Sequence, residues 1–214
     1  MTYYKLPQSM LDANNRKLKA VLEYSKVNMP KLPYHNFEHA HEFALAAGKL
    51  ADHENCGAGD AFCLLVTGYL HDLIYVPGAK DNEEKSAELS GQILPKIGFE
   101  DYETRLITAS LIPATKLPAN PKTLLEKIAC DADLYNLSTP AFFHKNQAVR
   151  EELGMTQSLE WQERSLEFLL KHRYYTISAQ CLWEPGKQKN IETLLGAIEA
   201  AYDTASAKTS EEMR

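Results

Sequence analysis

From Ala61 to Ile74 the chain reads AFCLLVTGYLHDLI, a run that is almost wholly apolar except for His71 and Asp72. A segment that is apolar on every side is typical of a helix buried in the core, and Pro77-Gly78 breaks the pattern soon afterwards. Burying an imidazole beside a carboxylate costs free energy unless something compensates the desolvated charge. A divalent metal ion would compensate it. The stretch therefore predicts a buried helix that ends in two metal ligands.

The rest of the sequence repeats the helical spacing of apolar residues and contains no convincing alternating pattern of a strand. Asp60 is the expected N-cap of the buried helix, and Thr156 of a later one. Pro113 is expected to end a short helix. The sequence predicts an all-α fold, a single-domain helical bundle over residues 1–214. The other expected helices span approximately Ser9–Val27, Tyr34–Asp52, Asn82–Ile97, Tyr102–Ile112, Leu124–Leu134, Pro140–Val149, Thr156–Leu169 and Lys189–Ala205.

The composition bounds the class of protein. Hydrophobic residues make up 44% of the 214 residues and charged residues 24%, as in an ordinary soluble protein. The net charge of −6 argues against binding to nucleic-acid polymers or to a membrane surface, both of which need clustered Lys and Arg. Met1–Gln8 lack the pattern of a signal peptide, and no apolar run reaches the length of a membrane span. Cys63 and Cys130 lie within apolar runs, so we expect reduced thiols in a cytoplasmic protein.

Three separated stretches carry residues that bind metals. His35 and His39 are four residues apart and are therefore expected on one face of a helix. His71-Asp72 supplies a second pair, and Asp131-Ala132-Asp133 closes an apolar helix with two carboxylates, either of which could be the ligand. Sites that mix imidazole and carboxylate suit Mn, Mg, Fe, Ni or Zn without choosing among them. The sequence predicts one site for a divalent metal where these stretches meet.

These residues resemble a known family. In an all-α chain, His39, His71-Asp72 and Asp133 resemble the H…HD…D pattern of HD-superfamily metal-dependent phosphohydrolases. Two stretches resemble motifs of cyclic-nucleotide phosphodiesterases: Tyr34-His35-Asn36-x-x-His39-Ala40 and Ala132-Asp133-Leu134-x-Asn136. Others are similar to a small, uncharacterised branch of predicted HD phosphohydrolases: His71-Asp72-x-Ile74-Tyr75, Asn82-Glu83-Glu84-x-Ser86-Ala87, Ala114-Thr115-Lys116 and Val149-Arg150-Glu151-Glu152. The motif core covers residues 34–152, and the helices within 156–205 are expected to pack on it.

The resemblance implies a role for each matching residue. His39, His71, Asp72 and Asp133 would be the metal ligands, with Asp133 favoured over Asp131 by the Ala-Asp-Leu likeness. The other assignments are His35 as general acid, Glu83 or Glu84 as the residue that positions water or binds a second ion, Lys116 and Arg150 as phosphate-binding residues, and Asn36 as a substrate contact.

Each assignment in this second group has a structural alternative. Glu83 and Glu84 are also what the first turn of a helix prefers. Asn36 can simply start a helix, Arg150 can pair with a glutamate of its own helix, and Lys116 can be a solvated loop charge.

The sequence therefore predicts an enzyme, a metal-dependent phosphoric ester hydrolase that acts on a small phosphate ester, nucleotides included, through a metal-activated water. Leu73-Ile74-Tyr75 replaces the Gly-rich continuation found in cyclic-nucleotide phosphodiesterases, so specificity for cyclic nucleotides is not implied. Leu117-Pro118 stands where the similar branch has a His, which leaves open a metal-binding regulatory protein without turnover. A further alternative is a zinc peptidase, because residues 35–39 spell H-x-x-E-H with Glu38 as the base.

Overall fold

A computed structural model describes the backbone of residues 8–212 and the side chains of residues 15–204 and of Ser206. Within this part of the chain every regular element is a helix, which confirms the predicted all-α fold. The elements are α1 (Gln8–Asn28), α2 (Phe37–His53), α3 (Ala58–Leu70), α4 (Asn82–Ile97), α5 (Asp101–Leu106), the π-helix η1 (Ile107–Leu111), α6 (Ile112–Ala114), α7 (Leu124–Asp133), the 3-10 helix η2 (Tyr135–Ser138), α8 (Phe142–Glu152), α9 (Leu159–Lys171) and α10 (Ile177–Glu212).

Helix α3 is the centre of the core. All residues from Ala61 to Leu70 are buried, as the apolar stretch predicted. Its N-cap is Gly57 rather than Asp60, because the helix begins one turn earlier and Asp60 lies in the first turn, where a carboxylate complements the helix dipole. At the other end His71 is the C-cap, so the two polar residues of the stretch lie where α3 stops.

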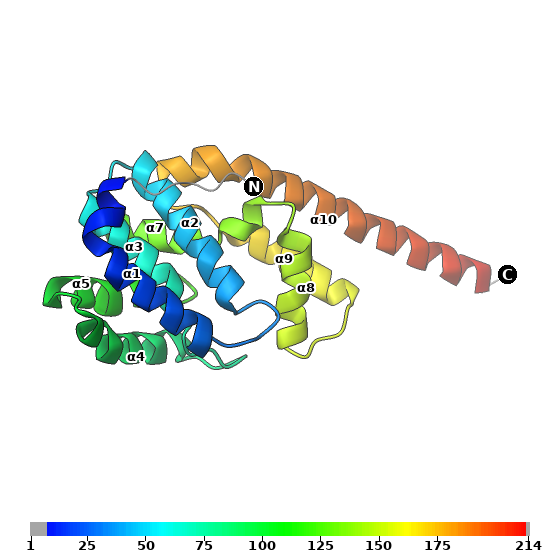
Figure 1. The fold of residues 1–214 in the computed structure, drawn as a ribbon. Coiled ribbons are helices and arrows are strands. Elements are labelled where there is room, and N and C mark those ends of the chain that lie inside the picture. The colour runs from blue at the N-terminus through cyan, green and yellow to red at the C-terminus, as the bar shows by residue number, and fades with distance from the viewer. Residues whose placement is uncertain (1–7, 213–214) are drawn as a thin grey trace.

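Helices α2 and α3 approach each other closely, because small residues face one another. A Cβ atom on Gly68 would lie 2.7 Å from the backbone nitrogen of Ala44, too close for any side chain. Ala40, Ala44 and Ala47 of α2 are fully buried. This close approach brings the amino end of α2 and the carboxyl end of α3 to the same region of the molecule (Figure 1).

Two helix boundaries near prolines differ from those that the sequence predicted. The helix expected to end before Pro113 continues to Ala114, because Ile107–Leu111 widens into a π-helix in which Ile112 N donates to Ile107 O. The last helix begins at Ile177 rather than near Lys189 and includes Pro185. A third boundary also differs, because Ser158 caps α9 in place of Thr156.

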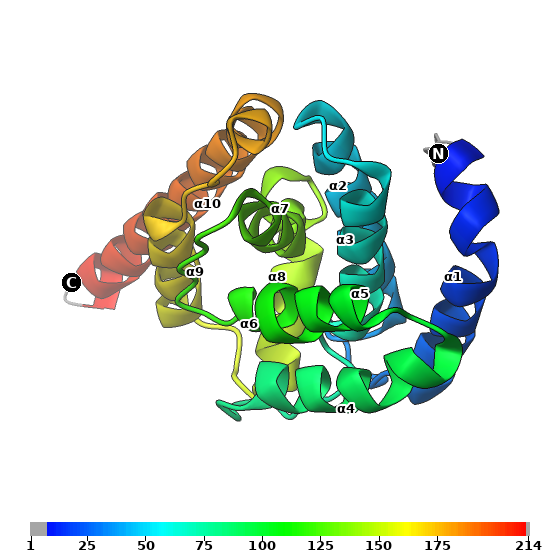
Figure 2. The ribbon, with the colours of Figure 1, turned by 90° about the vertical axis from the view of Figure 1, so that its left-hand side faces the viewer.

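The helices form one domain with two adjoining apolar clusters. The larger cluster is built mainly from α2, α3, α7 and their neighbours, and the smaller one joins η2, α8, α9 and α10. Figure 2 shows α1 and α10 on opposite sides of the molecule, with α2, α3 and α7 between them. The carboxyl-terminal half of α10 extends beyond the other helices (Figure 1). None of the helices between residues 8 and 212 has the length and apolar character needed to span a membrane.

Candidate metal centre

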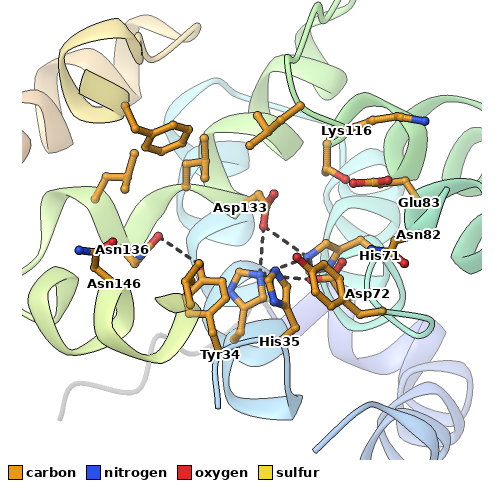
Figure 3. A pocket seen from close by; sticks show the side chains of 18 of the residues that line it. Tyr34, His35, His71, Asp72, Asn82, Glu83, Lys116, Asp133, Asn136 and Asn146 are labelled. Atoms are coloured by element: carbon orange, nitrogen blue, oxygen red, sulfur yellow. Dashed lines mark hydrogen bonds and ion pairs between the residues drawn. The ribbon is translucent and has the colours of Figure 1, made fainter. Parts of the chain in front are cut away.

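Four side chains from three distant segments meet at one point. His39 comes from the first turn of α2, His71 and Asp72 follow α3, and Asp133 is the last residue of α7. Figure 3 shows His71, Asp72 and Asp133 directed toward a common centre. His71 Nε2 lies 2.9 Å from Asp72 Oδ2 and 3.3 Å from Asp133 Oδ1. His39 Nε2 lies 3.1 Å from Asp133 Oδ1, 3.6 Å from Asp72 Oδ2 and 3.3 Å from His71 Nε2.

These separations fit a single coordination sphere. Nitrogen and oxygen ligands bind Zn at about 2.0–2.2 Å, so neighbouring ligand atoms around one ion are about 3.0–3.5 Å apart. The distances in the cluster, 2.9–3.6 Å, extend beyond this range by only 0.1 Å at either end. His39, His71 and Asp72 are moreover buried, with their ligand atoms mutually within 4.8 Å. The donor set therefore fits a divalent ion held by two imidazoles and two carboxylates.

Hydrogen bonds fix the ring of His71 and the backbone of His39. The Nδ1 of His71 lies 3.0 Å from the carbonyl oxygen of Gly68, which can only accept, so Nδ1 donates and Nε2 faces the centre. This arrangement is typical of metal-binding histidines, whose second nitrogen is fixed by a hydrogen bond. His39 is placed by the N-cap of α2, because Asn36 Oδ1 accepts hydrogen bonds from the backbone nitrogens of Glu38 and His39.

The pKa values of the cluster indicate that its two carboxylates are negatively charged and favour a positive charge beside them. Burial opposes protonation of His71, yet Asp72 and Asp133 outweigh it and hold the pKa of His71 well above its ordinary value. Burial alone would raise the pKa values of the two carboxyl groups, but the neighbouring imidazoles lower both overall. The two aspartates are therefore charged in a buried place, where either a protonated imidazole or a bound cation must balance them.

Asp131, the alternative ligand, faces the opposite way. Its carboxylate accepts hydrogen bonds from the backbone nitrogens of Tyr175 and Thr176 and from the Thr176 hydroxyl, at 2.7–2.8 Å. Burial raises the pKa of Asp131 to about 6, although these hydrogen bonds act against the rise. Asp131 therefore ties α7 to the start of α10, and Asp133 alone of the two reaches the histidines.

The four-residue spacing predicted that His35 and His39 share one face of a helix, and this prediction is wrong. Asn36 is the N-cap of α2, so His35 precedes the helix and adopts a separate position. Its Nδ1 lies 2.6 Å from Glu152 Oε2, and its ring stacks on Tyr75 with centroids 3.4 Å apart. The other oxygen of Glu152 accepts hydrogen bonds from the backbone nitrogens of Tyr34 and His35. Burial opposes ionisation of Glu152, but the contacts with His35 lower its pKa overall.

A cavity of about 760 Å³ opens over the cluster, a size that suits a small organic ligand. His35, Glu83 and Lys116 line it together with the four candidate ligands. Burial raises the pKa of Glu83, and the negative charge of Asp72 adds to the rise. Lys116 is held by an ion pair with Glu84 at the rim.

Three predicted site residues do not line the cavity. Glu84 is exposed and pairs with Lys116. The guanidinium of Arg150 donates to the carbonyl oxygen of Met155, so the structure does not bring it to the cavity. Asn36 acts as the helix cap and also donates to the carbonyl oxygen of Leu32.

The comparisons with known proteins agree with this geometry. The family model described as HD domain matches residues 36–136, the stretch that begins at the cap of α2 and ends just past Asp133. This stretch, somewhat less than half of the chain, is similar to an HD domain. The fold of the chain is similar to the crystal structure of a predicted HD superfamily hydrolase from an uncultured Thermotogales bacterium, with a TM-score of 0.61. That likeness has 18% sequence identity and covers 86% of this chain and 92% of the other. No curated protein matches the chain.

Two residues of the stretch that matches the HD model support the site in ways that the sequence did not predict. The side chain of Asn82 bonds to both the nitrogen and the carbonyl oxygen of Val76, and Ser86 does the same to Ile74. These bonds pin the segment that follows Asp72. Asn82 and Ser86 lie one turn apart on α4, a spacing visible in the sequence, but their partners are set by tertiary structure alone.

Proposed function

We propose that this protein is a metal-dependent phosphohydrolase that cleaves a small phosphate ester, nucleotides included. The observation that carries the proposal is the convergence of His39, His71, Asp72 and Asp133 beneath a cavity that also contains His35. The HD domain and the likeness to a predicted HD superfamily hydrolase favour hydrolysis as the class of reaction.

The four ligands would hold one divalent ion, which we leave open among Mn, Mg, Fe, Ni and Zn. When bound, such an ion acts as a Lewis acid that lowers the pKa of water and neutralises phosphoryl charge. The protein contributes donor atoms that already lie 2.9–3.6 Å apart, so we expect little rearrangement on binding. Glu83 lies in the cavity near Asp72 and is our candidate for positioning the attacking water.

His35 is our candidate general acid. Its Nδ1 is engaged by Glu152, so Nε2 is the ring nitrogen left to give a proton to the departing oxygen. Glu152 would stabilise the protonated ring, and stacking on Tyr75 fixes the ring plane. The acid, its orienting carboxylate and the metal ligands thus come from elements that are far apart in the sequence.

Lys116 remains a candidate for binding phosphate, although it would have to exchange Glu84 for the substrate. Lys80 is a second cation at the cavity, exposed and without a partner among the described residues. Arg150 is not part of the proposal, because it does not line the cavity. The peptidase alternative gains no support either, since Glu38 is exposed and lies outside the cavity.

The free cysteines include Cys63 and Cys130, both buried as predicted, which is in keeping with the cytoplasmic location that we expect. We expect the binding partner of the protein to be its substrate, a small phosphoester.

The test is a phosphate-release assay on protein first stripped by a chelator and then supplied with each of the five metals. The panel should contain alkyl phosphates, aryl phosphates, nucleoside monophosphates and cyclic nucleotides. We expect metal-dependent release from at least one class, abolished in Asp72→Asn and retained in His144→Ala, whose side chain is exposed outside the cavity. Metal binding without release from any substrate would contradict the proposal and favour a regulatory protein.

A further inference from the structure

The cavity has two unlike sides. In Figure 3, Glu83 and Lys116 lie on one side of Asp133, while Asn136 and Asn146 lie on the other. The first side is charged. The second side, which we call the amide arm, is defined by Asn136, Asn146, Ser165, Phe142, Trp161 and Phe168.

The amide arm contains no ionised side chain. Arg164 also lines the cavity, but it pairs with Glu160 at 2.7 Å and its side chain is 58% exposed. A charged organic group among these six residues would therefore lose water without gaining a partner of opposite charge, and an anion could gain one only by displacing Glu160 from Arg164. Three aromatic residues line the arm, and flat rings pack well against such walls. The arm thus favours an uncharged, flat group.

The hydrogen bonds of Ser165 leave part of the Asn146 amide free. Ser165 Oγ lies 2.8 Å from the carbonyl oxygen of Trp161, 3.0 Å from Asn146 Nδ2 and 3.1 Å from Asn146 Oδ1. A hydroxyl has one hydrogen, so when Ser165 donates to Trp161 it can only accept from Asn146. Asn146 Oδ1 and the second hydrogen of Nδ2 then remain available as an acceptor and a donor side by side.

Two further donors lack partners in the same arm. Asn136 Oδ1 accepts from the Tyr34 hydroxyl at 3.3 Å, and no acceptor for Asn136 Nδ2 is found among the described residues. Trp161 is 8% exposed, and its Nε1 is fully buried and has no partner in the described part of the chain. Buried polar groups are nearly always paired, so unpaired donors beside a cavity point to a ligand that supplies acceptors.

We propose that the organic group of the substrate is an uncharged flat ring bearing a carboxamide or lactam, and that Asn146, held by Ser165, selects it. The inference rests on the proposed phosphohydrolase function, because it places the phosphate at the candidate metal centre and the ring in the amide arm. A carboxamide or lactam offers adjacent donor and acceptor atoms that match the free atoms of Asn146. A carboxylate offers acceptors alone and carries a charge that the arm does not balance.

The experiment uses three non-hydrolysable probes that share a phosphonate and a flat ring: benzylphosphonate, 4-carbamoylbenzylphosphonate and 4-carboxybenzylphosphonate. Their affinities for the metal-loaded protein are measured by calorimetry. We expect the carbamoyl compound to bind about tenfold more tightly than the carboxy compound, because a site built for hydrogen bonding rejects a mismatched group. Asn146→Leu, which keeps the size of the side chain, should bring the two affinities to within about twofold.

Gln147→Ala is the matched control, since Gln147 is exposed on the same helix and lies outside the cavity. It should retain the wild-type preference. If Asn146→Leu does not fold, Ser165→Ala provides the same test, because it removes the hydroxyl that holds the amide. Equal affinities in the wild-type protein, a preference for the carboxylate, or binding of none of the probes would overturn the inference.

Hydrolysis of the corresponding 4-substituted phenyl phosphates is measured in parallel. Selective binding of the carbamoyl phosphonate without hydrolysis of any phosphate would contradict the proposed function and leave the selectivity standing. Hydrolysis without selectivity would contradict this inference alone.

Discussion

Asp72 is buried and Asp133 is half-buried, at a point where no lysine or arginine of the described residues pairs with either of them. Their only ionic partners in that part of the chain are His39 and His71. Two carboxylates in such a place are costly unless cations balance them. We therefore expect these two carboxylates to favour binding of a cation between the two histidines.

At this scale the role of His35 is open to a direct test. A general acid matters most when the leaving group is poor, so His35→Ala should lower kcat for an alkyl phosphate by about 10²–10³-fold. The loss for 4-nitrophenyl phosphate should be much smaller, because its leaving oxygen needs no proton. Glu152→Gln should show the same pattern at reduced size. Equal losses for both substrates in steady-state assays would rule out proton donation by His35.

The sequence predicted single residues best where a polar group interrupts an apolar pattern. His71 and Asp72 stand out because they end a buried helix, and the structure brings them to His39 and Asp133, although binding of a metal stays a prediction. The phosphate-binding role suggested for Arg150 rested on its place in a matching motif and on its residue type, and the structure does not bring it to the cavity. Its partner, the carbonyl oxygen of Met155, belongs to the turn after α8 and leaves no mark in the sequence.

Among the helices, α10 fixes the segment that follows Asp133. The side chain of Asn190 donates to the carbonyl oxygens of Leu137 and Thr139, and Gly186 lies directly against Ser138. A Cβ atom on Gly186 would lie 2.0 Å from the Ser138 carbonyl oxygen. The carboxyl-terminal helix therefore supports the metal centre from outside the residues that match the family model.

Replacing Gly186 should reveal this support. Gly186→Ala must displace backbone, and we expect a loss of about 2–3 kcal/mol in the free energy of unfolding, together with weaker metal binding. Gly196→Ala is the control in the same helix, because nothing lies within 4 Å of its Cβ position. There alanine should be neutral or stabilise by up to about 1 kcal/mol. Denaturant titration measures both, and equal effects of the two substitutions would contradict the predicted close contact.

The junction of α9 and α10 should make stability depend on pH. Burial, together with the positive charges of Lys187 and Arg173, lowers the pKa of His172 to about 3. The unfolded chain takes up a proton below about pH 6.5, which the folded protein refuses until about pH 3. The free energy of unfolding should therefore fall as the pH falls through this window, by at most about 1.4 kcal/mol per unit from this residue.

His172→Gln should remove that part of the slope. The measurement is denaturant unfolding of both proteins between pH 6.5 and 4, so that other titrating groups cancel in the difference. An unchanged slope in the variant would show that His172 is not held neutral.

Element boundaries were predicted less well than element types, and prolines account for much of the error. Pro113 was expected to end a helix, yet a π-helix precedes it and the helical stretch continues to Ala114. The last helix was expected to begin near Lys189, yet α10 begins at Ile177 and continues through Pro185. In each case tertiary packing outweighs the local preference. The hydrogen bonds from Tyr175 and Thr176 to Asp131 start α10 far from the position that the apolar pattern indicated.

Considered as a whole, the molecule places its candidate centre between two groups of helices. The ligands come from α2, the end of α3 and α7, and the amide arm comes from η2, α8 and α9. The all-α fold could be predicted because the helical spacing of apolar residues recurs along the sequence. The cavity was not predicted, because the orientation of α8 and α9 relative to the ligands depends on their packing against α10.

Metal binding should stabilise the entire fold. An ion that binds the folded state alone adds about 2.7 kcal/mol at a hundredfold excess over its dissociation constant. We expect Tm to rise with the concentration of the preferred divalent ion and to fall on chelation. In His71→Ala the dependence on metal should disappear. If no divalent ion changes the Tm of the wild-type protein, the expected stabilisation by a bound metal is contradicted.

The most direct test of the metal centre is the metal content of three purified proteins, the wild type, His71→Ala and His144→Ala, each loaded with divalent ions and then dialysed. Mass spectrometry of the dissolved protein should find about one ion per chain in the wild type and in His144→Ala, as expected for one shared coordination sphere, and almost none in His71→Ala. Equal metal content in all three proteins, or none in the wild type, would contradict the account.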